Sequence, residues 1–197
     1  MKLKSTTPHD SFFKGMAENK SVSVDLLKSS LPEALFAKID LDSLTLVNKS
    51  FITKKLDAFH SDVIYEANIN GHEGYIAFVL EHQSVPDSLL AFRKLEYNVG
   101  LMRQHLKKRT DKLPVIINIC LYHGLQSPYP YSTDLMECFS DVELARQWMF
   151  QPFQLIDLTV LKDQAIAQHG HAGLLQFLLK HAREASLLRY LKDLVEL

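Results

Sequence analysis

Two acidic residues and an amide are the side chains in this sequence best suited to chemistry. Asp62 stands near the start of one β-rich run, Glu81 stands at the end of a second, and Gln83 follows Glu81 by two residues. If the runs pair as a hairpin, both carboxylates lie near its open end and can hold a divalent cation. Gln83 would share a strand face with Glu81 and could orient a water or hold a phosphate oxygen. The alternative is that Asp62 and Glu81 are simply solvated.

The two runs have the composition of paired strands. Residues 61–65 and 75–83 are rich in β-branched and aromatic side chains, and the link over residues 70–74 contains glycine. A glycine-bearing loop of this length is typical of a β-hairpin. Residues 75–80 are apolar throughout, which predicts a central strand covered on both faces.

A crossover helix is expected to follow the hairpin. After a turn at residues 84–87, the sequence predicts a long helix to about residue 109 and then a buried apolar strand over residues 115–122. Strand, helix and strand in this order predict a parallel pair. An amphipathic stripe is expected on the helix, formed by Phe92, Leu95, Val99, Met102 and Leu106.

The flanking segments complete an α/β architecture. We expect helices within residues 8–16, 22–30 and 32–39, with an edge strand over residues 44–52. Short helical pieces at 134–139 and 142–150, a strand at 154–158 and helices from residue 162 follow a loop at 125–133. The sequence therefore predicts a mixed β-sheet flanked by helices, with a core over residues 1–160. A helical C-terminal extension over residues 161–197 is expected to pack on that core.

Composition excludes several classes of protein. The chain of 197 residues is 47% hydrophobic and has a formal net charge of −1, which argues neither for nor against nucleic acid. No apolar run reaches the roughly 20 residues that span a bilayer, and no apolar signal segment follows the basic N-terminus, so we expect a cytoplasmic protein without a membrane partner. Cys120 is predicted to be a buried thiol, and two cysteines without CxxC spacing give neither a zinc nor a disulfide pattern.

Ordered motifs along nearly the whole chain carry a resemblance to a known family. They are Pro8-His9-Asp10-x-x-Phe13-Lys14, Ser61-Asp62-Val63-Ile64-Tyr65, Val79-Leu80-Glu81-His82-Gln83-Ser84 and Leu121-Tyr122-His123-Gly124. Similar segments between and after them are Ala91-Phe92-Arg93-x-Leu95-x-Tyr97, Asp134-Leu135 and Glu143-Leu144-Ala145-Arg146. Together they closely resemble the YhgA-like transposases, also called recombination-promoting nucleases, of the PD-(D/E)xK superfamily.

The resemblance implies a restriction-endonuclease-like core that cleaves DNA phosphodiester bonds with Mg²⁺ (or Mn²⁺), in recombination or on mobile DNA. It places Asp62 and Glu81 at the two acidic positions of the motif and makes the backbone carbonyl of His82 a further metal ligand. Gln83 stands where the superfamily usually has lysine, and Ser61 replaces the proline. Asp10 matches a position where many members carry an outer carboxylate, and its alternative role is a helix N-cap.

Positive charge must come from other positions. Arg93 could reach back toward the metal and shares a helix face with Tyr97, while the alternatives are that Arg93 pairs with an acid and Tyr97 packs. Two basic clusters are expected to contact DNA phosphates, although the helix dipole alone explains part of the second. The first contains Lys54 and Lys55, and the second contains Arg103, Lys107, Lys108 and Arg109.

Three functions are compatible with these residues. The first is a metal-dependent DNA endonuclease. The second is a catalytically weak or inactive nuclease-fold module that binds DNA or a protein partner, which the Gln83 substitution favours. The third is a hydrolase with an acid–base pair of another kind, for which the aromatic-rich signature of a sugar cleft is absent. The apolar C-terminal stretch could close the core or form a homodimer contact.

Overall fold

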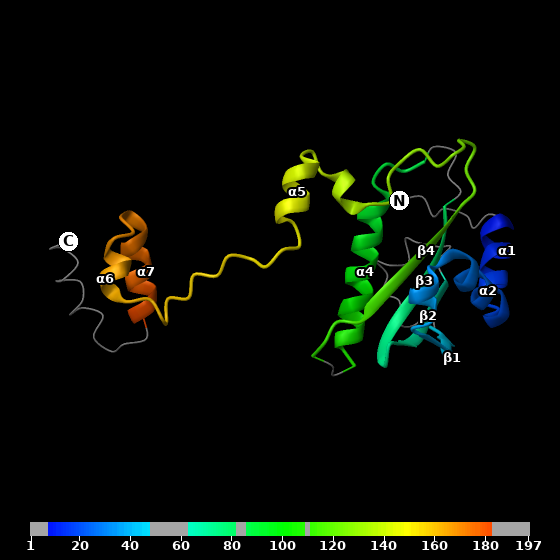
Figure 1. Ribbon diagram of the computed structural model, residues 1–197, viewed down its shortest axis with the longest axis horizontal. Helices are drawn as coiled ribbons and strands as arrows, with labels where there is room; N and C mark the ends of the chain where they lie inside the picture. The colour runs from blue at the N-terminus through cyan, green and yellow to red at the C-terminus, as the bar shows by residue number, and fades with distance from the viewer. Residues whose placement is uncertain (1–7, 48–62, 82–85, 109–110, 183–197) are drawn as a thin grey trace. The chain divides into compact units, whose positions relative to one another are not determined.

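The chain folds into two compact units, residues Met1–Gln147 and Trp148–Leu197, hereafter the first and second unit. The computed structural model describes residues 8–47, 63–81, 86–108 and 111–182, and the side chains from residue 11 onward within these ranges (Figure 1). The predicted packing of a C-terminal extension on the core remains a prediction.

A four-stranded sheet forms the centre of the first unit. It contains β1 (Ile39–Leu46), β2 (Val63–Ile69), β3 (His72–Glu81) and β4 (Val115–Tyr122), in the spatial order β1-β2-β3-β4. The pairs β1–β2 and β2–β3 are antiparallel, whereas β3 and β4 are parallel. The predicted mixed sheet and the parallel crossover are therefore confirmed, as expected of a restriction-endonuclease-like core.

The β2–β3 hairpin is tighter than predicted. Its turn consists of Asn70 and Gly71 alone, with φ angles of 54° and 84°. Two consecutive left-handed residues match the twist of the flanking strands, and Asn-Gly is the preferred sequence for such a turn. Residues 72–74, which were expected in the loop, extend β3 instead. The resulting register pairs Val63 with Phe78.

Helices cover both faces of the sheet, and β3 is buried on both sides as predicted. Three helices cover one face, namely α1 (Pro8–Ala17), α2 (Lys20–Ser30) and α3 (Glu33–Phe36). They pack against the strand residues whose side chains point to this face, which include Tyr65 and Phe78. On the other face, α4 (Leu90–Leu106) covers the strand residues whose side chains point the opposite way, including Tyr75 and Ala77 (Figure 1). β3 is therefore the central element from which both layers are built.

The buried stripe of α4 differs from the predicted one. Leu90, Tyr97, Leu101 and His105 are its buried residues. Phe92 is 44% exposed and Leu106 is 40% exposed, although both were predicted to face the core. Tyrosine and histidine can face a core when a polar partner lies within reach, and the Tyr75 hydroxyl lies 3.2 Å from the His105 ring. Apolar periodicity alone therefore selected the wrong side of this helix.

The prediction that β4 is a fully buried strand was wrong. Ile117 and Ile119 are buried, whereas Val115, Asn118 and Cys120 are exposed. On the other face of β4, Ile116 alone packs against the described core, so this face of the strand is mostly exposed. Cys120 consequently has an exposed side chain, not the predicted buried thiol.

Several boundaries also move. α3 ends at Phe36, not near residue 39, because β1 begins at Ile39 and ends at Leu46. The predicted edge strand over 44–52 is thus displaced toward the N-terminus, and its residues 48–52 lie outside the described part. Residues 154–158 form no strand, and Leu155 and Ile156 are exposed. Helical structure is confirmed in η2 (Leu135–Cys138), α5 (Val142–Trp148), α6 (Asp163–Ala167) and α7 (His171–His181).

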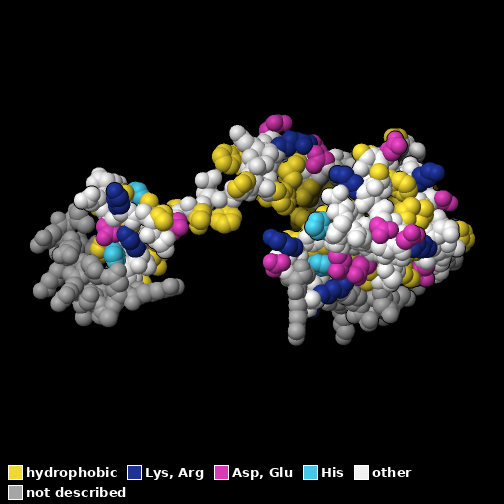
Figure 2. Space-filling model, turned by 60° about the horizontal axis from the view of Figure 1, so that its bottom comes forward, with side chains coloured by type: hydrophobic (Ala, Val, Ile, Leu, Met, Phe, Trp, Pro, Cys, Tyr) yellow, Lys and Arg dark blue, Asp and Glu magenta, His cyan; other side chains and the backbone are white. Residues whose placement is uncertain are grey.

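Charged side chains of both signs mix on the surface. Figure 2 shows acidic and basic side chains interspersed over one face of the first unit. Within the described residues, none of the helices has the length and apolar content needed to cross a membrane.

Candidate active site at the carboxyl end of β3

Glu81 is the described residue around which the candidate site is built. It is the last residue of β3, pairs with Tyr122 of β4, and its backbone carbonyl accepts a 2.7 Å hydrogen bond from the His123 N–H. The residue is only 3% exposed, so the alternative of a solvated acid at a strand end is wrong for Glu81. Burying a carboxylate is unfavourable unless charge or hydrogen bonds compensate it, which makes this position attractive to a cation.

The other predicted members of the metal site lie outside the described residues. Asp62, His82 and Gln83 are among them, so their convergence with Glu81 remains a prediction. Within the described part of the chain, His, Cys, Asp and Glu side chains form no group of three that could hold a metal ion. Asp10 is placed in the first turn of α1, two residues after the helix begins, and not at its N-cap.

An ion pair joins the first turn of α4 to the residues just before the helix. The Arg93 guanidinium lies 2.6 Å from the Asp87 carboxylate, whose other oxygen accepts a 2.9 Å hydrogen bond from the Leu89 N–H. Burial opposes ionisation of Asp87, but the hydrogen bonds from Arg93 and Leu89 outweigh it and hold its pKa below the usual range. The structure thus realises the alternative role of Arg93, pairing with an acid, and its role toward a metal stays a prediction.

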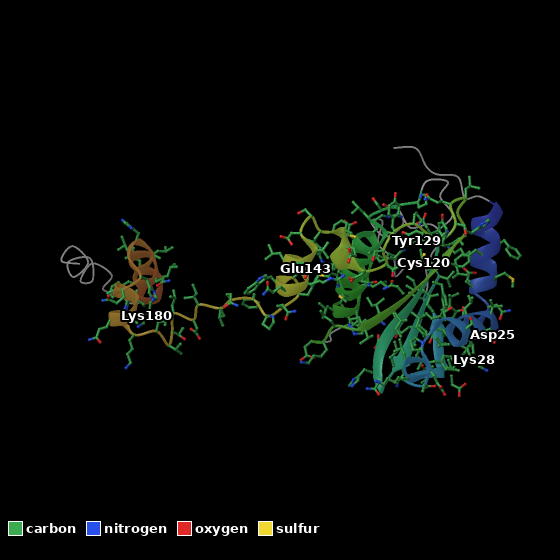
Figure 3. All side chains as sticks on the ribbon, turned by 45° about the horizontal axis from the view of Figure 1, so that its top comes forward. Asp25, Lys28, Cys120, Tyr129, Glu143 and Lys180 are labelled. Atoms are coloured by element: carbon green, nitrogen blue, oxygen red, sulfur yellow. The ribbon has the colours of Figure 1, made fainter. Side chains whose placement is uncertain are left out.

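Tyr129 brings the loop after β4 to the same end of the sheet. Its hydroxyl donates a 3.1 Å hydrogen bond to the Asp87 backbone carbonyl, and its ring packs edge-on against Tyr122 at 4.9 Å between centroids. Burial, together with the negative charge of Glu81 and other acids nearby, raises the pKa of Tyr129 to about 12. The phenol is therefore a hydrogen-bond donor at neutral pH. Figure 3 labels Tyr129 close to Cys120 of β4.

Sequence reasoning missed Tyr129 as a neighbour of Glu81 and missed its bond to Asp87. Asp87 was interpreted only as part of a turn, and Tyr129 lies in a segment that was interpreted only as a loop. Their hydrogen bond joins positions 42 apart in the sequence, which no local pattern reveals. Tyr97, by contrast, is 1% exposed and packs with Leu101 and Ala77, so the packing alternative is confirmed.

The described members of the basic cluster predicted at the end of the long helix lie toward the opposite end of the sheet from Glu81. Lys108 bonds Glu66 and Glu73, each at 2.8 Å, near the amino end of β3. Glu73 and Glu81 stand about 26 Å apart along that strand at 3.3 Å per residue. The structure therefore does not bring this cluster to Glu81. Arg103 and Lys107 are exposed, while Lys54, Lys55 and Arg109 lie outside the described residues.

The Lys108 cluster makes stability depend on pH. Hydrogen bonding from Lys108 lowers the pKa of Glu73 against the opposing effect of burial. For Lys108, burial acts against the charge, but hydrogen bonds to Glu66 and Glu73 outweigh it and raise its pKa. The stabilisation is therefore present at neutral pH and is lost as the pH falls below the ordinary carboxyl pKa of 4.5.

Replacing Lys108 should reveal that dependence. We expect Lys108→Met to lower the free energy of unfolding by at most about 1 kcal/mol at pH 7, because these side chains are partly exposed. The difference from the wild type should shrink between pH 5 and about pH 3, measured by urea unfolding at each pH. A difference that stays constant or grows as the pH falls would contradict the assignment.

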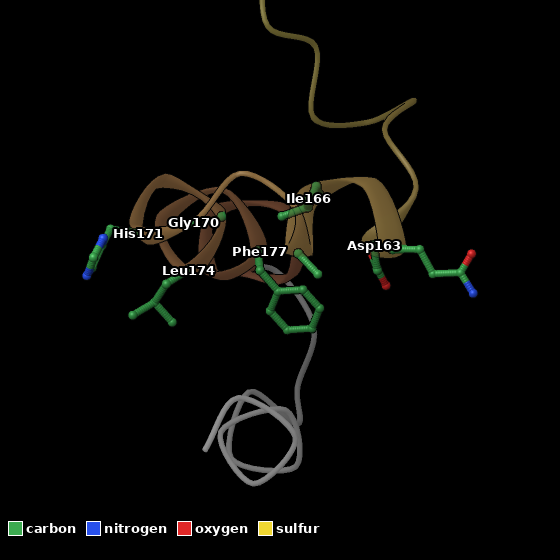
Figure 4. Close-up of a pocket in the computed structure, with 9 residues that line it drawn as sticks. Asp163, Ile166, Gly170, His171, Leu174 and Phe177 are labelled. Atoms are coloured by element: carbon green, nitrogen blue, oxygen red, sulfur yellow. The ribbon is translucent and has the colours of Figure 1, made fainter. Parts of the chain in front are cut away.

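The second unit contains a cavity of a different character. About 600 Å³ lies between α6 and α7, lined mainly by apolar side chains that include Ile166, Leu174 and Phe177 (Figure 4). Asp163 at its border is bound by Lys180 at 2.6 Å and by His181 at 3.3 Å. Its carboxylate is thus neutralised, and this cavity is a poorer place for a cation than the end of β3.

The chain matches a family model along almost its whole length. Residues 7–197 match the family described as "Putative transposase, YhgA-like". No solved structure matches the chain. The motifs from which the resemblance was inferred thus lie within the matched range.

Curated relatives carry nuclease names, and some are named inactive. The chain is 39% identical over its full length to recombination-promoting nuclease RpnC of Escherichia coli K12, covering 66% of that protein. It is 38% identical to recombination-promoting nuclease RpnA of the same strain, over 95% of this chain and 64% of that protein. It is equally 38% identical to the inactive recombination-promoting nuclease-like protein RpnE, over 93% of this chain and 61% of that protein. The chain therefore spans slightly less than two thirds of the length of these relatives.

Proposed function

Because the chain belongs to the YhgA-like transposase family, we propose that it is a metal-dependent DNA endonuclease that acts in recombination or on mobile DNA. The observation that carries the proposal is the burial of Glu81 at the shared end of β3 and β4, in a chain whose relatives are named nucleases. A buried carboxylate at the open end of parallel strands is suited to binding a hard cation.

Asp62 and Glu81 are proposed to hold Mg²⁺ or Mn²⁺ through carboxylate oxygens, with the His82 backbone carbonyl as a further ligand. These cations prefer oxygen ligands and commonly take only one or two protein carboxylates, so this donor set fits them. A bound cation lowers the pKa of its water and offsets charge that develops at phosphorus. Gln83 is proposed to orient the attacking water. Hydrolysis joins the water oxygen to phosphorus and breaks one ester P–O bond, and the leaving oxygen takes up a proton to become a hydroxyl group.

A second function is favoured by one specific observation. RpnE, which is named inactive, is as similar to this chain as RpnA is. A nuclease-fold module that binds DNA or a protein partner without cleaving is therefore the alternative. It differs from the first proposal in a single measurable property, which is turnover in the presence of a divalent metal.

Plasmid cleavage separates the two functions. We expect supercoiled DNA to be nicked or linearised with Mg²⁺ or Mn²⁺, and neither with EDTA nor with Ca²⁺, which fits the site but activates water poorly. Asp62→Ala should abolish the reaction while leaving the melting temperature nearly unchanged. Binding of the same DNA without metal-dependent cleavage would favour the module, and cleavage that survives Asp62→Ala would overturn the site assignment.

A further inference from the structure

The face of α4 that covers the sheet carries a lysine with a buried charge. Lys94 follows the buried Leu90 by one helical turn and precedes the buried Tyr97 by another, so the three residues share one face. The Lys94 Nζ atom is buried and lies 5.8 Å from the centre of the Tyr97 ring. An ammonium in such a place is unfavourable unless negative charge or an aromatic face compensates it.

Helix and strand geometry put this lysine at the level of Glu81. The His105 ring lies edge-on against Tyr75, with 5.8 Å between centroids, which aligns the far end of α4 with the start of β3. From His105 back to Lys94 the helix rises about 16 Å, and from Tyr75 to Glu81 the strand rises about 20 Å. The difference of about 4 Å is within the reach of a lysine side chain. Helical side chains also lean toward the N-terminus, which here is the Glu81 end.

Two other cations near the ends of α4 are already paired with acids. Arg93 is paired with Asp87 at 2.6 Å, and Lys108 is bound by two glutamates at the opposite end of the sheet. Gln83, at the position where the superfamily usually has lysine, is an amide without charge. Resting on the proposed nuclease function, we propose that Lys94 supplies the positive charge that Gln83 cannot, beside Glu81 and the phosphate that is hydrolysed.

In this position Lys94 weakens metal binding and speeds cleavage. Without metal, its ammonium compensates the buried Glu81 carboxylate, and it must therefore oppose the approach of a second cation. With DNA bound, the same ammonium stabilises negative charge that grows on the phosphoryl oxygens during hydrolysis. Removing the charge should consequently strengthen metal binding and slow cleavage. A lysine that only supports the fold would not produce these opposite changes.

Three variants test this placement. Lys94→Met removes the charge and keeps most of the side-chain volume, Lys94→Arg keeps the charge, and Lys28→Met is the matched control at an exposed lysine of α2. Single-turnover plasmid cleavage with saturating Mg²⁺ should fall about 100-fold in Lys94→Met, as for loss of one charge-stabilising group. Lys94→Arg should recover a substantial part of that loss. Lys28→Met should stay within about threefold of the wild type, because α2 packs on the face of the sheet opposite to the one that α4 covers.

Binding of Mn²⁺ alone, without DNA, supplies the second measurement. Titration followed by electron paramagnetic resonance should show about tenfold tighter binding to Lys94→Met and no change in Lys28→Met. If Lys94→Met does not fold, Lys94→Gln replaces it in both assays. Wild-type cleavage and unchanged Mn²⁺ affinity in the uncharged variant would overturn the role of Lys94. Absence of metal-dependent cleavage in the wild-type protein would instead overturn the proposed function.

Discussion

Glu81→Gln is expected to reduce metal-dependent DNA cleavage at least about 100-fold, because the amide keeps the shape of the side chain but removes the charge that holds the cation. The fold should survive. Glu81 is 3% exposed, and the amide relieves the burial of one charge but leaves the buried Lys94 ammonium, which we place beside it, without that compensation. These two effects partly offset each other, so we expect the melting temperature without metal to fall by no more than about a few degrees. Plasmid cleavage and thermal unfolding of the same preparation measure both effects.

Glu73→Gln is the matched control for this prediction. Glu73 and Glu81 lie on the same strand and the same face, but Glu73 is bound by Lys108 at the other end. The control should cleave DNA as the wild type does and lose a little stability. If both variants cleave normally, the carboxyl end of β3 is not the metal site. If both lose activity equally, the loss reflects the fold and not the site.

Leu101→Ala should produce the largest loss of stability among single truncations on α4. Leu101 is 0% exposed and packs with Ile64, Tyr75 and Tyr97 between the helix and the sheet. Truncating a fully buried leucine removes its burial and leaves a cavity, so the free energy of unfolding should fall by about 3 kcal/mol. Urea unfolding followed by circular dichroism measures this change.

Leu106→Ala provides the comparison on the same helix. Leu106 is 40% exposed, although the apolar pattern assigned it to the core-facing stripe. Its truncation should lower the free energy of unfolding by less than about 1 kcal/mol. Equal losses at Leu101 and Leu106 would show that α4 does not face the sheet as described.

The sequence was sufficient for the topology but not for the facing of α4. Asn70-Gly71 and the β-rich runs on either side of it predict the hairpin, and the long helix before the β4 segment predicts the parallel crossover. The side of α4 that is buried could not be predicted, because Tyr97 and His105 are not scored as core residues by apolar periodicity. Their burial depends on polar and aromatic partners on β3, such as Tyr75, which are distant in the sequence.

The candidate site could likewise be predicted only in part from the sequence. Glu81 could be identified from the sequence because it ends a β-rich run. Its neighbours Tyr122 of β4 and Tyr129 of the following loop lie more than 35 residues further along the chain, so its burial could not be predicted. The expected basic neighbours were chosen by clustering in the sequence, and the structure puts Lys108 at the opposite end of β3. Lys94 was not singled out, because a lysine between an arginine and a leucine on an amphipathic helix has the pattern of a solvated residue. Only its buried Nζ distinguishes it.

The most direct test of a metal-dependent nuclease site at the end of β3 is the anomalous scattering of Mn²⁺ in crystals of the protein with a short DNA duplex. The predicted result is an anomalous peak about 2.1 to 2.3 Å from a Glu81 carboxylate oxygen, a distance typical of a small divalent cation, with Asp62 on the same ion. The assignment would be contradicted if the DNA in the crystal is cleaved while the Mn²⁺ peak lies elsewhere and Glu81 contacts only protein groups.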